Sequence, residues 1–240
     1  MSASHTEGDD FPQLTWDLLD EPTVTEFSSR SSWSNWPNVH WTASQFWDVV
    51  KSSATEDPSK LHATWHHLVM TAGNFKRQAP ISLPDLPDIL NSVRGVDDHM
   101  RFTIEVDGMQ KTVERDNSES WEELTDIPGI GVATATTILS ALWPGYHVIA
   151  DRRDVGAAIG LAYNEASREQ LLKSAGYEGE IVSWKRYQWF RSKVIARAKA
   201  IDVEPVAVER ALYEIDLATR TNGGTPWRKY RRELCRVLKV

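Results

Sequence analysis

Apolar residues recur every three or four positions along most of the chain, and polar segments separate these stretches. Such spacing places apolar side chains on one face of a helix, so it predicts a mainly α-helical protein. The expected helices span residues 42–53, 58–72, 84–93, 117–124, 133–142, 152–161, 165–175, 180–201, 204–220 and 226–239.

Residues 101–114 follow a different pattern, in which apolar and polar residues alternate around Asp107-Gly108. Alternation is typical of a half-buried strand, and Asp-Gly favours the tight turn of a β-hairpin. We therefore expect strands at 101–106 and 109–114, as a small insertion in a helical fold.

The start of the chain lacks a clear helical pattern. Residues 1–30 are polar and acidic, and we expect a disordered leader there. Residues 31–41 contain three Trp residues in an irregular order, which predicts an ordered loop. Trp36 and Trp41 are candidates for a base pocket, because aromatic rings stack on an extruded base. The alternative is that they pack between lobes of the protein.

A glycine-containing hairpin, Ile127-Pro128-Gly129-Ile130-Gly131, lies between two expected helices. Proline does not continue the preceding helix, and glycine allows a positive φ or the close approach of another molecule. Backbone amides at the start of the next helix, together with its dipole, form a seat for one phosphate. Such a contact recognises the nucleic-acid backbone and not its sequence.

The hairpin is followed by Thr134-Ala135 and, 17 residues after Thr134, by Asp151. This combination resembles the helix-hairpin-helix-GPD superfamily of DNA glycosylases, whose hairpin has the form Leu-Pro-Gly-Val-Gly-x-x-Thr-Ala with an essential aspartate downstream. The resemblance covers residues 124–160. It implies a two-lobed helical fold with Asp151 at the cleft: a leader at 1–30, one lobe at 31–143 and a second lobe at 144–240.

The resemblance also implies roles for individual residues. Asp151 would be the catalytic residue, since a carboxylate beside the anomeric carbon stabilises the positive charge that develops on the sugar. The alternative is that Asp151 only caps its own helix. Relatives that cut the strand carry a Schiff-base lysine where this chain has Ala133, so the resemblance implies a monofunctional enzyme. The hairpin residues expected to contact DNA are Gly129, Ile130, Gly131, Ala133 and Thr134.

Several basic side chains are further candidates for DNA contacts. Arg152 and Arg153 follow Asp151, and they either pair with that aspartate or hold a phosphate. In the helix expected at 180–201, Lys185, Arg186 and Trp189 lie on the face opposite the apolar one. A basic face with one aromatic residue suits a phosphate backbone, although an ordinary solvated face has the same pattern.

Charge and composition limit these interpretations. The formal net charge is −7, but residues 1–30 hold seven acidic residues and one basic residue and so carry −6 of it. DNA binding therefore needs a local basic surface. The single cysteine, Cys235, excludes a four-cysteine iron-sulfur cluster. His62 and His66 lack further ligands at metal-site spacing, so we expect no metal there; by resemblance, a monovalent cation at the hairpin is compatible with the sequence.

No stretch of the sequence has the pattern of a signal peptide or a membrane span, so we expect a cytoplasmic protein without membrane contacts. We also expect a monomer. The leading hypothesis is a monofunctional DNA glycosylase that acts on double-stranded DNA. It would flip out a damaged, mismatched or modified base and leave an abasic site, in repair or in defence against modified phage DNA. The alternatives are a non-catalytic helix-hairpin-helix DNA-binding module and a hydrolase of free modified nucleosides.

Overall fold

The computed structural model describes residues 14–30, 36–52, 58–75, 101–162, 183–219 and 227–240. These residues form a mainly helical structure with one two-stranded antiparallel sheet, so the expected fold class is confirmed at this level. In chain order the elements are η1 (Trp16–Leu18), α1 (Glu21–Ser28), α2 (Trp36–Lys51), α3 (Pro58–Phe75), β1 (Arg101–Val106), β2 (Met109–Glu114), α4 (Ser118–Glu122), η3 (Glu123–Asp126), α5 (Val132–Leu142), α6 (Arg152–Leu161), α8 (Trp184–Ala200), α9 (Pro205–Thr219) and α10 (Trp227–Leu238).

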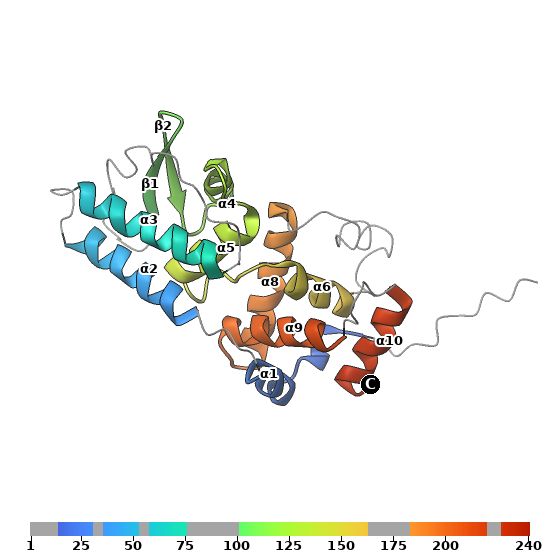
Figure 1. The fold of residues 1–240 in the computed structure, drawn as a ribbon. Coiled ribbons are helices and arrows are strands. Elements are labelled where there is room, and N and C mark those ends of the chain that lie inside the picture. Colours follow the sequence, from blue (N-terminus) through green and yellow to red (C-terminus); the bar gives the residue numbers. More distant parts are fainter. Residues whose placement is uncertain (1–13, 31–35, 53–57, 76–100, 163–182, 220–226) are drawn as a thin grey trace, which may run out of the picture.

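One lobe contains α2, α3, α4, α5 and the β-hairpin, which lie together on the left of Figure 1. Its core is rich in aromatic rings; Phe102 of β1 lies 5.6 Å from Phe46 of α2 and 5.2 Å from Trp65 of α3 between ring centroids. The strands pair as expected, with Arg101 opposite Glu114 and a tight turn at Asp107-Gly108, where both residues have positive φ. Phe102 thus packs the sheet against α2 and α3.

The second lobe is built around α9, which contacts α1, α6, α8 and α10 (Figure 1). On α6, an added Cβ at Gly160 would come within 2.7 Å of Leu234 Cδ2, so α10 packs closely against α6. The Tyr230 hydroxyl of α10 also donates to Asp216 of α9 at 2.8 Å. These contacts join the last three helices of the chain to α6.

The expected disordered leader is wrong for residues 14–30, which form η1 and α1 in the second lobe. Five apolar side chains of this segment are buried in the core: Leu14, Trp16, Leu19, Val24 and Phe27. The Arg197 guanidinium of α8 donates to the Asp17 carboxylate at 2.9 Å and to the Leu19 carbonyl at 2.8 Å. The many acidic residues of this stretch led to the prediction of disorder, although its apolar residues are buried. Residues 1–13 lie outside the described part of the chain.

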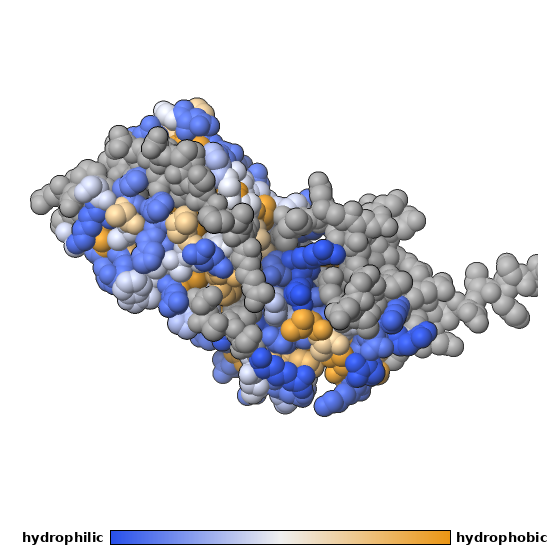
Figure 2. Space-filling view, viewed as in Figure 1, coloured by the Kyte–Doolittle hydropathy of each residue, from blue (hydrophilic) through white to orange (hydrophobic). Residues whose placement is uncertain are grey.

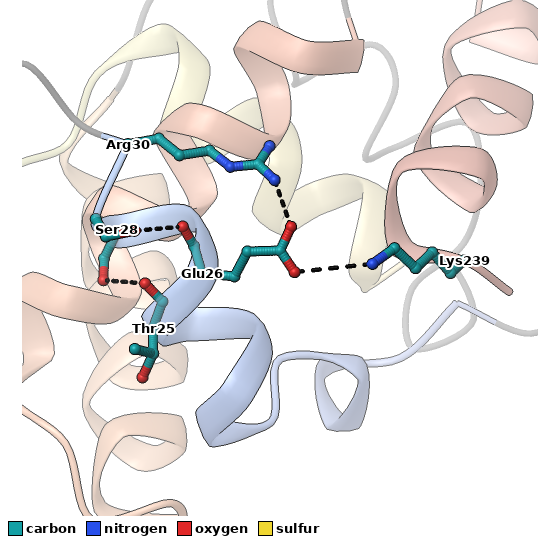
Figure 3. A network of polar contacts seen from close by, with 6 residues as sticks. Thr25, Glu26, Ser28, Arg30 and Lys239 are labelled. Atoms are coloured by element: carbon teal, nitrogen blue, oxygen red, sulfur yellow. Dashed lines mark hydrogen bonds and ion pairs between the residues drawn. The ribbon is translucent and has the colours of Figure 1, made fainter.

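A short chain of charges links α1 to the end of the protein (Figure 3). The Glu26 carboxylate contacts the Arg30 guanidinium on one side and lies 3.8 Å from Lys239 Nζ on the other. All three side chains are substantially exposed, so we expect a small contribution to stability.

The expected loop at 31–41 is wrong for residues 36–41, which are the first turns of α2. Trp36, Val39 and Ala43 are buried at helical spacing, and Pro37 stands in the first turn, where a missing amide proton costs nothing. Residues 31–35 and the helices expected at 84–93 and 165–175 lie outside the described residues.

The described surface in Figure 2 is mainly hydrophilic, and some apolar side chains gather over α9 and towards α10. The exposed apolar residues include Leu217 on α9 and Val240 at the end of the chain. Within the described ranges, none of the helices combines the length and the apolar character that a bilayer crossing requires.

Candidate functional site

The glycine hairpin is a tight turn with a buried base and an exposed tip. Ile127 and Ile130 are buried, whereas Gly129 and Gly131 are exposed. The Ile130 amide donates to the Ile127 carbonyl at 3.0 Å, and Gly129 has a φ of 85°, in the left-handed region that favours glycine. The two isoleucines therefore hold the glycine backbone at the surface.

The start of α5 is open to a ligand. Its N-cap residue is Gly131, so no side chain caps the first amides of the helix. A Cβ added at Gly131 would meet no heavy atom within 4 Å. This combination of uncapped amides, a helix dipole and free space is what a phosphate oxygen requires. Ala133 is half-buried and Thr134 is fully buried, so the Thr134 side chain does not reach the surface.

Carboxylates also lie near the hairpin. Lys111 of β2 forms an ion pair with Asp126, the last residue of η3, and this contact raises the pKa of Lys111. Burial raises the pKa of Glu123 in the same turn. The negative charge beside the hairpin is thus partly neutralised within the protein.

After α5 ends, the chain makes a turn and runs back alongside this helix. The Tyr146 and His147 amides both donate to the Trp143 carbonyl at 3.1 Å, and Gly145 has a φ of 87°. The buried residues 148–150 then run back, and the Ala150 amide donates to Thr136 Oγ1 at 3.1 Å. Thr136 lies near the middle of α5, so the chain has run back at least half the length of α5 towards the hairpin before α6 begins.

Asp151 is the N-cap of α6. Its Oδ1 accepts from the Arg153 amide at 2.6 Å, and Asp154 Oδ2 accepts from the Asp151 amide at 3.2 Å, which completes a capping box. The Asp151 side chain therefore caps its own helix. Asp151 is nevertheless half-exposed, while Asp154 is fully buried. A carboxylate accepts several hydrogen bonds, so a carboxylate that caps a helix is able to contact other groups as well.

Two α9 side chains that the sequence analysis missed lie beside the start of α6. The Arg153 guanidinium lies 5.4 Å from the centroid of the Tyr213 ring. Burial raises the pKa of Tyr213, Arg153 opposes this shift, and the charges of Asp151 and Asp154 add to it. Burial also raises the pKa of Glu214, and Arg30 and Arg153 oppose that shift. No sequence motif marks these residues; only the packing of α9 on α6 brings them to Asp151.

The first turns of α2 approach α9. Burial lowers the pKa of His40, and the positive charge of Arg210 on α9 lowers it further. Trp36, one turn earlier, is 4% exposed, with its ring centroid 4.7 Å from His40 and 5.4 Å from Phe75. Trp36 therefore packs as a core residue, as the alternative in the sequence analysis allowed. Trp41 is exposed and has its ring contact with His67 of α3 at 6.0 Å.

The basic face of α8 divides into two parts. Lys185 is exposed and Arg186 is half-buried in the first turn, which the bond from Trp184 Nε1 to Thr125 Oγ1 (3.3 Å) places beside η3. Trp189 instead packs edge-on against Trp16, with 6.5 Å between ring centroids. Thus Lys185 and Arg186 lie at the hairpin side of the protein, whereas Trp189 helps to hold η1.

A buried polar contact joins the turn after α5 to α8. His147 Nε2 donates to the Arg115 carbonyl at 3.0 Å, and His147 Nδ1 lies 2.7 Å from the Tyr187 hydroxyl. Burial, aided by Arg191, lowers the pKa of His147 to about 3, so the imidazole is neutral at neutral pH. Burial also raises the pKa of Tyr187 far above its ordinary value. Both groups are therefore uncharged parts of the lobe contact.

The structure thus places the first turn of α8 beside η3, which leads into the hairpin, and it places Asp151 and Arg153 at the start of α6 beside α9; Arg152 is exposed there. Among the described residues, no group of three or more His, Cys, Asp or Glu side chains has the arrangement of a metal site. We find no family model, no curated protein and no solved structure that matches this chain.

Proposed function

We propose that the protein is a monofunctional DNA glycosylase of the helix-hairpin-helix-GPD type. It would hydrolyse the N-glycosidic bond of a damaged, mismatched or modified base in double-stranded DNA. The observation that carries this proposal is the return of the chain along α5 towards the exposed glycine hairpin: Ala150, next to the half-buried Asp151, bonds to Thr136 of α5.

The hairpin would bind one phosphate of the DNA strand. The uncapped amides at the start of α5 and the space above Gly131 support this role. Lys185 at the start of α8 adds a nearby positive charge for the strand. The interaction would be independent of base sequence and would hold the strand while a base leaves the stack, which costs a few kcal/mol.

Asp151 would act on the sugar of the flipped nucleotide. Departure of the base leaves positive charge on the ring, and a carboxylate close to the anomeric carbon stabilises it and orients a water molecule. The N-terminus of α6 favours a negative charge at this position. Ala133 offers no amine to form a Schiff base, so the product would be an abasic site in an intact strand.

A non-catalytic DNA-binding module is the second candidate, and the capping box at Asp151 is the observation that favours it. In that function the carboxylate would serve only α6, and the protein would bind DNA without changing it. Both candidates require the hairpin contact, so hairpin variants do not separate them. Base release separates them directly.

The experiment that tests the proposal incubates the protein with duplexes that carry a panel of damaged, mismatched and phage-type modified bases. Half of each sample receives hot alkali, which cleaves the strand at an abasic site. Strand cleavage that requires both the protein and alkali supports a monofunctional glycosylase and identifies the base that it releases. Cleavage without alkali would contradict the monofunctional assignment, and binding without release across the panel would favour the non-catalytic module. The same experiment also incubates the protein with free modified nucleosides, and release of their bases would favour the hydrolase alternative.

A further inference from the structure

The segment that leads into Asp151 is held by side chains from three different helices. Its three consecutive amides donate to buried acceptors: Ile149 to Glu209 Oε2 of α9 at 2.8 Å, Ala150 to Thr136 Oγ1 of α5 at 3.1 Å, and Asp151 to Asp154 Oδ2 of α6 at 3.2 Å. All three acceptor side chains are fully buried. A hydrogen bond to a buried side chain therefore holds the backbone at each of residues 149–151.

Buried polar side chains are costly unless they are hydrogen-bonded, so packing alone does not explain Glu209 and Thr136. A leucine or valine would fill such interior positions at lower cost. What these two side chains supply is an acceptor for a backbone amide that has no neighbouring strand in the described structure. Their shared effect is to hold the backbone on the N-terminal side of Asp151.

We propose that Thr136 and Glu209 are positioning residues for Asp151, an inference that rests on the proposed function. Thr136 belongs to α5, whose first turn would bind the DNA phosphate, and Glu209 belongs to the central helix of the second lobe. A single rigid helix thus connects the phosphate seat to the aspartate. The separation between a bound strand and the carboxylate is fixed in this way, and a displacement of about 1 Å is enough to slow a reaction about 100-fold.

The first test uses Thr136→Val, which keeps the shape of the side chain and removes the acceptor, with Thr136→Ser as the matched control. We expect Thr136→Val to slow single-turnover base release at least about tenfold with DNA affinity within about twofold, and Thr136→Ser to stay within about threefold of wild type. Equal losses in both variants, or a wild-type rate in Thr136→Val, would overturn the inference.

A second readout needs no substrate. Hydrogen exchange by NMR measures protection of the Ala150 amide and of the Arg153 amide, which donates to Asp151. We expect Thr136→Val to speed exchange of both amides about tenfold and to leave the α9 amides unchanged. Faster exchange at Ala150 alone would show that Thr136 does not position Asp151. If wild type releases no base, the proposed function fails, while this measurement still decides the structural inference.

Glu209 provides an independent pair of variants. Glu209→Gln keeps an oxygen that accepts from the Ile149 amide, whereas Glu209→Ala removes it. We expect release within about threefold of wild type for Glu209→Gln and at least about a tenfold loss for Glu209→Ala, with DNA affinity retained. Identical rates for the two variants would remove Glu209 from the proposal. If Glu209→Ala does not fold, the Thr136 variants decide.

Discussion

The hydroxyl of Tyr187 and Nδ1 of His147 lie 2.7 Å apart in the buried contact between α8 and the turn after α5. The Arg115 carbonyl only accepts, so His147 Nε2 carries the proton and Nδ1 accepts from the Tyr187 hydroxyl. The imidazole ring is nearly parallel to the Tyr187 ring, with 6.2 Å between centroids, and meets Trp121 edge-on at 4.6 Å. This neutral pair joins the turn after α5, in the first lobe, to α8 in the second lobe, and the pair itself involves no salt bridge.

The His147 contact predicts a dependence of stability on pH. The pKa of His147 is about 3 in the folded protein, and an unfolded histidine has a pKa of about 6.5. Between these values only the unfolded chain takes up the proton, so the free energy of unfolding falls as the pH drops. We expect a loss of about 2 kcal/mol from this group between pH 6.5 and pH 5.

Urea unfolding of wild type and His147→Gln at the two pH values measures this loss. The variant is less stable at pH 7, but it lacks the histidine titration and so has a shallower pH dependence. Parallel pH profiles for the two proteins would show that His147 is not the titrating group.

The two hairpin glycines should respond differently to alanine. Gly129 has a positive φ, so Gly129→Ala strains the backbone by about 1–2 kcal/mol. Gly131 has a φ of −91° and open space around it, so Gly131→Ala changes the free energy of unfolding by less than about 1 kcal/mol. The added methyl group nevertheless occupies the proposed phosphate seat, and duplex binding should weaken about tenfold or more for every sequence.

Fluorescence anisotropy with two unrelated duplexes measures this effect. Gly145→Ala is the matched control for Gly129→Ala, because Gly145 also has a positive φ and lies at the other end of α5. It should lower stability and leave DNA affinity unchanged. An effect of Gly131→Ala on one duplex only would argue against a phosphate contact.

Much of the fold follows from local sequence patterns. Helical periodicity predicts α3 and α5 to within a few residues, and alternation around Asp107-Gly108 predicts both strands with their observed bounds. These elements have their apolar residues in one regular stripe or on one face, so no distant contact is needed to recognise them. Asp151 and the hairpin are site candidates through the resemblance of one short stretch, residues 124–160, to known glycosylases, and their roles stay predictions.

The features that were missed depend on tertiary contacts. The segment 14–30 is ordered because α9 buries its scattered apolar residues, and α2 begins at Trp36 because that ring packs on Phe75. Tyr213 and Glu214 reach the candidate site only because α9 crosses the start of α6. The segment 148–150 has side-chain acceptors on α5 and α9, up to 60 residues away in sequence, which no local pattern reveals.

Tyr213 should contribute to the action of the proposed site. The Arg153 guanidinium lies 5.4 Å from the centroid of its ring, so Tyr213→Ala removes a contact of the Arg153 side chain, two residues from Asp151. We expect kcat/KM for base release to fall about tenfold in Tyr213→Ala and to change little in Tyr213→Phe, which keeps the ring. Leu217→Ala, an exposed site one turn further along α9, is the control. Equal values for Tyr213→Ala and this control would exclude Tyr213.

The contact between α6 and α10 predicts a steric effect on stability. An added Cβ at Gly160 would lie 2.7 Å from Leu234 Cδ2 and 3.4 Å from the Tyr230 ring. Gly160→Ala should therefore destabilise the protein by about 1–3 kcal/mol through overpacking. In the Leu234→Ala background the same change should cost less, because the colliding methyl group is gone. Additive losses in thermal or urea unfolding would contradict this explanation.

The most direct test of the proposed function compares wild type with Asp151→Asn on the duplex from which wild type releases a base. Asparagine keeps the size of the side chain and an oxygen that caps α6, but it removes the negative charge. If Asp151 is catalytic, base release is lost in single-turnover assays while DNA affinity and thermal stability stay close to those of wild type. Base release at the wild-type rate by Asp151→Asn would contradict a catalytic role for this carboxylate.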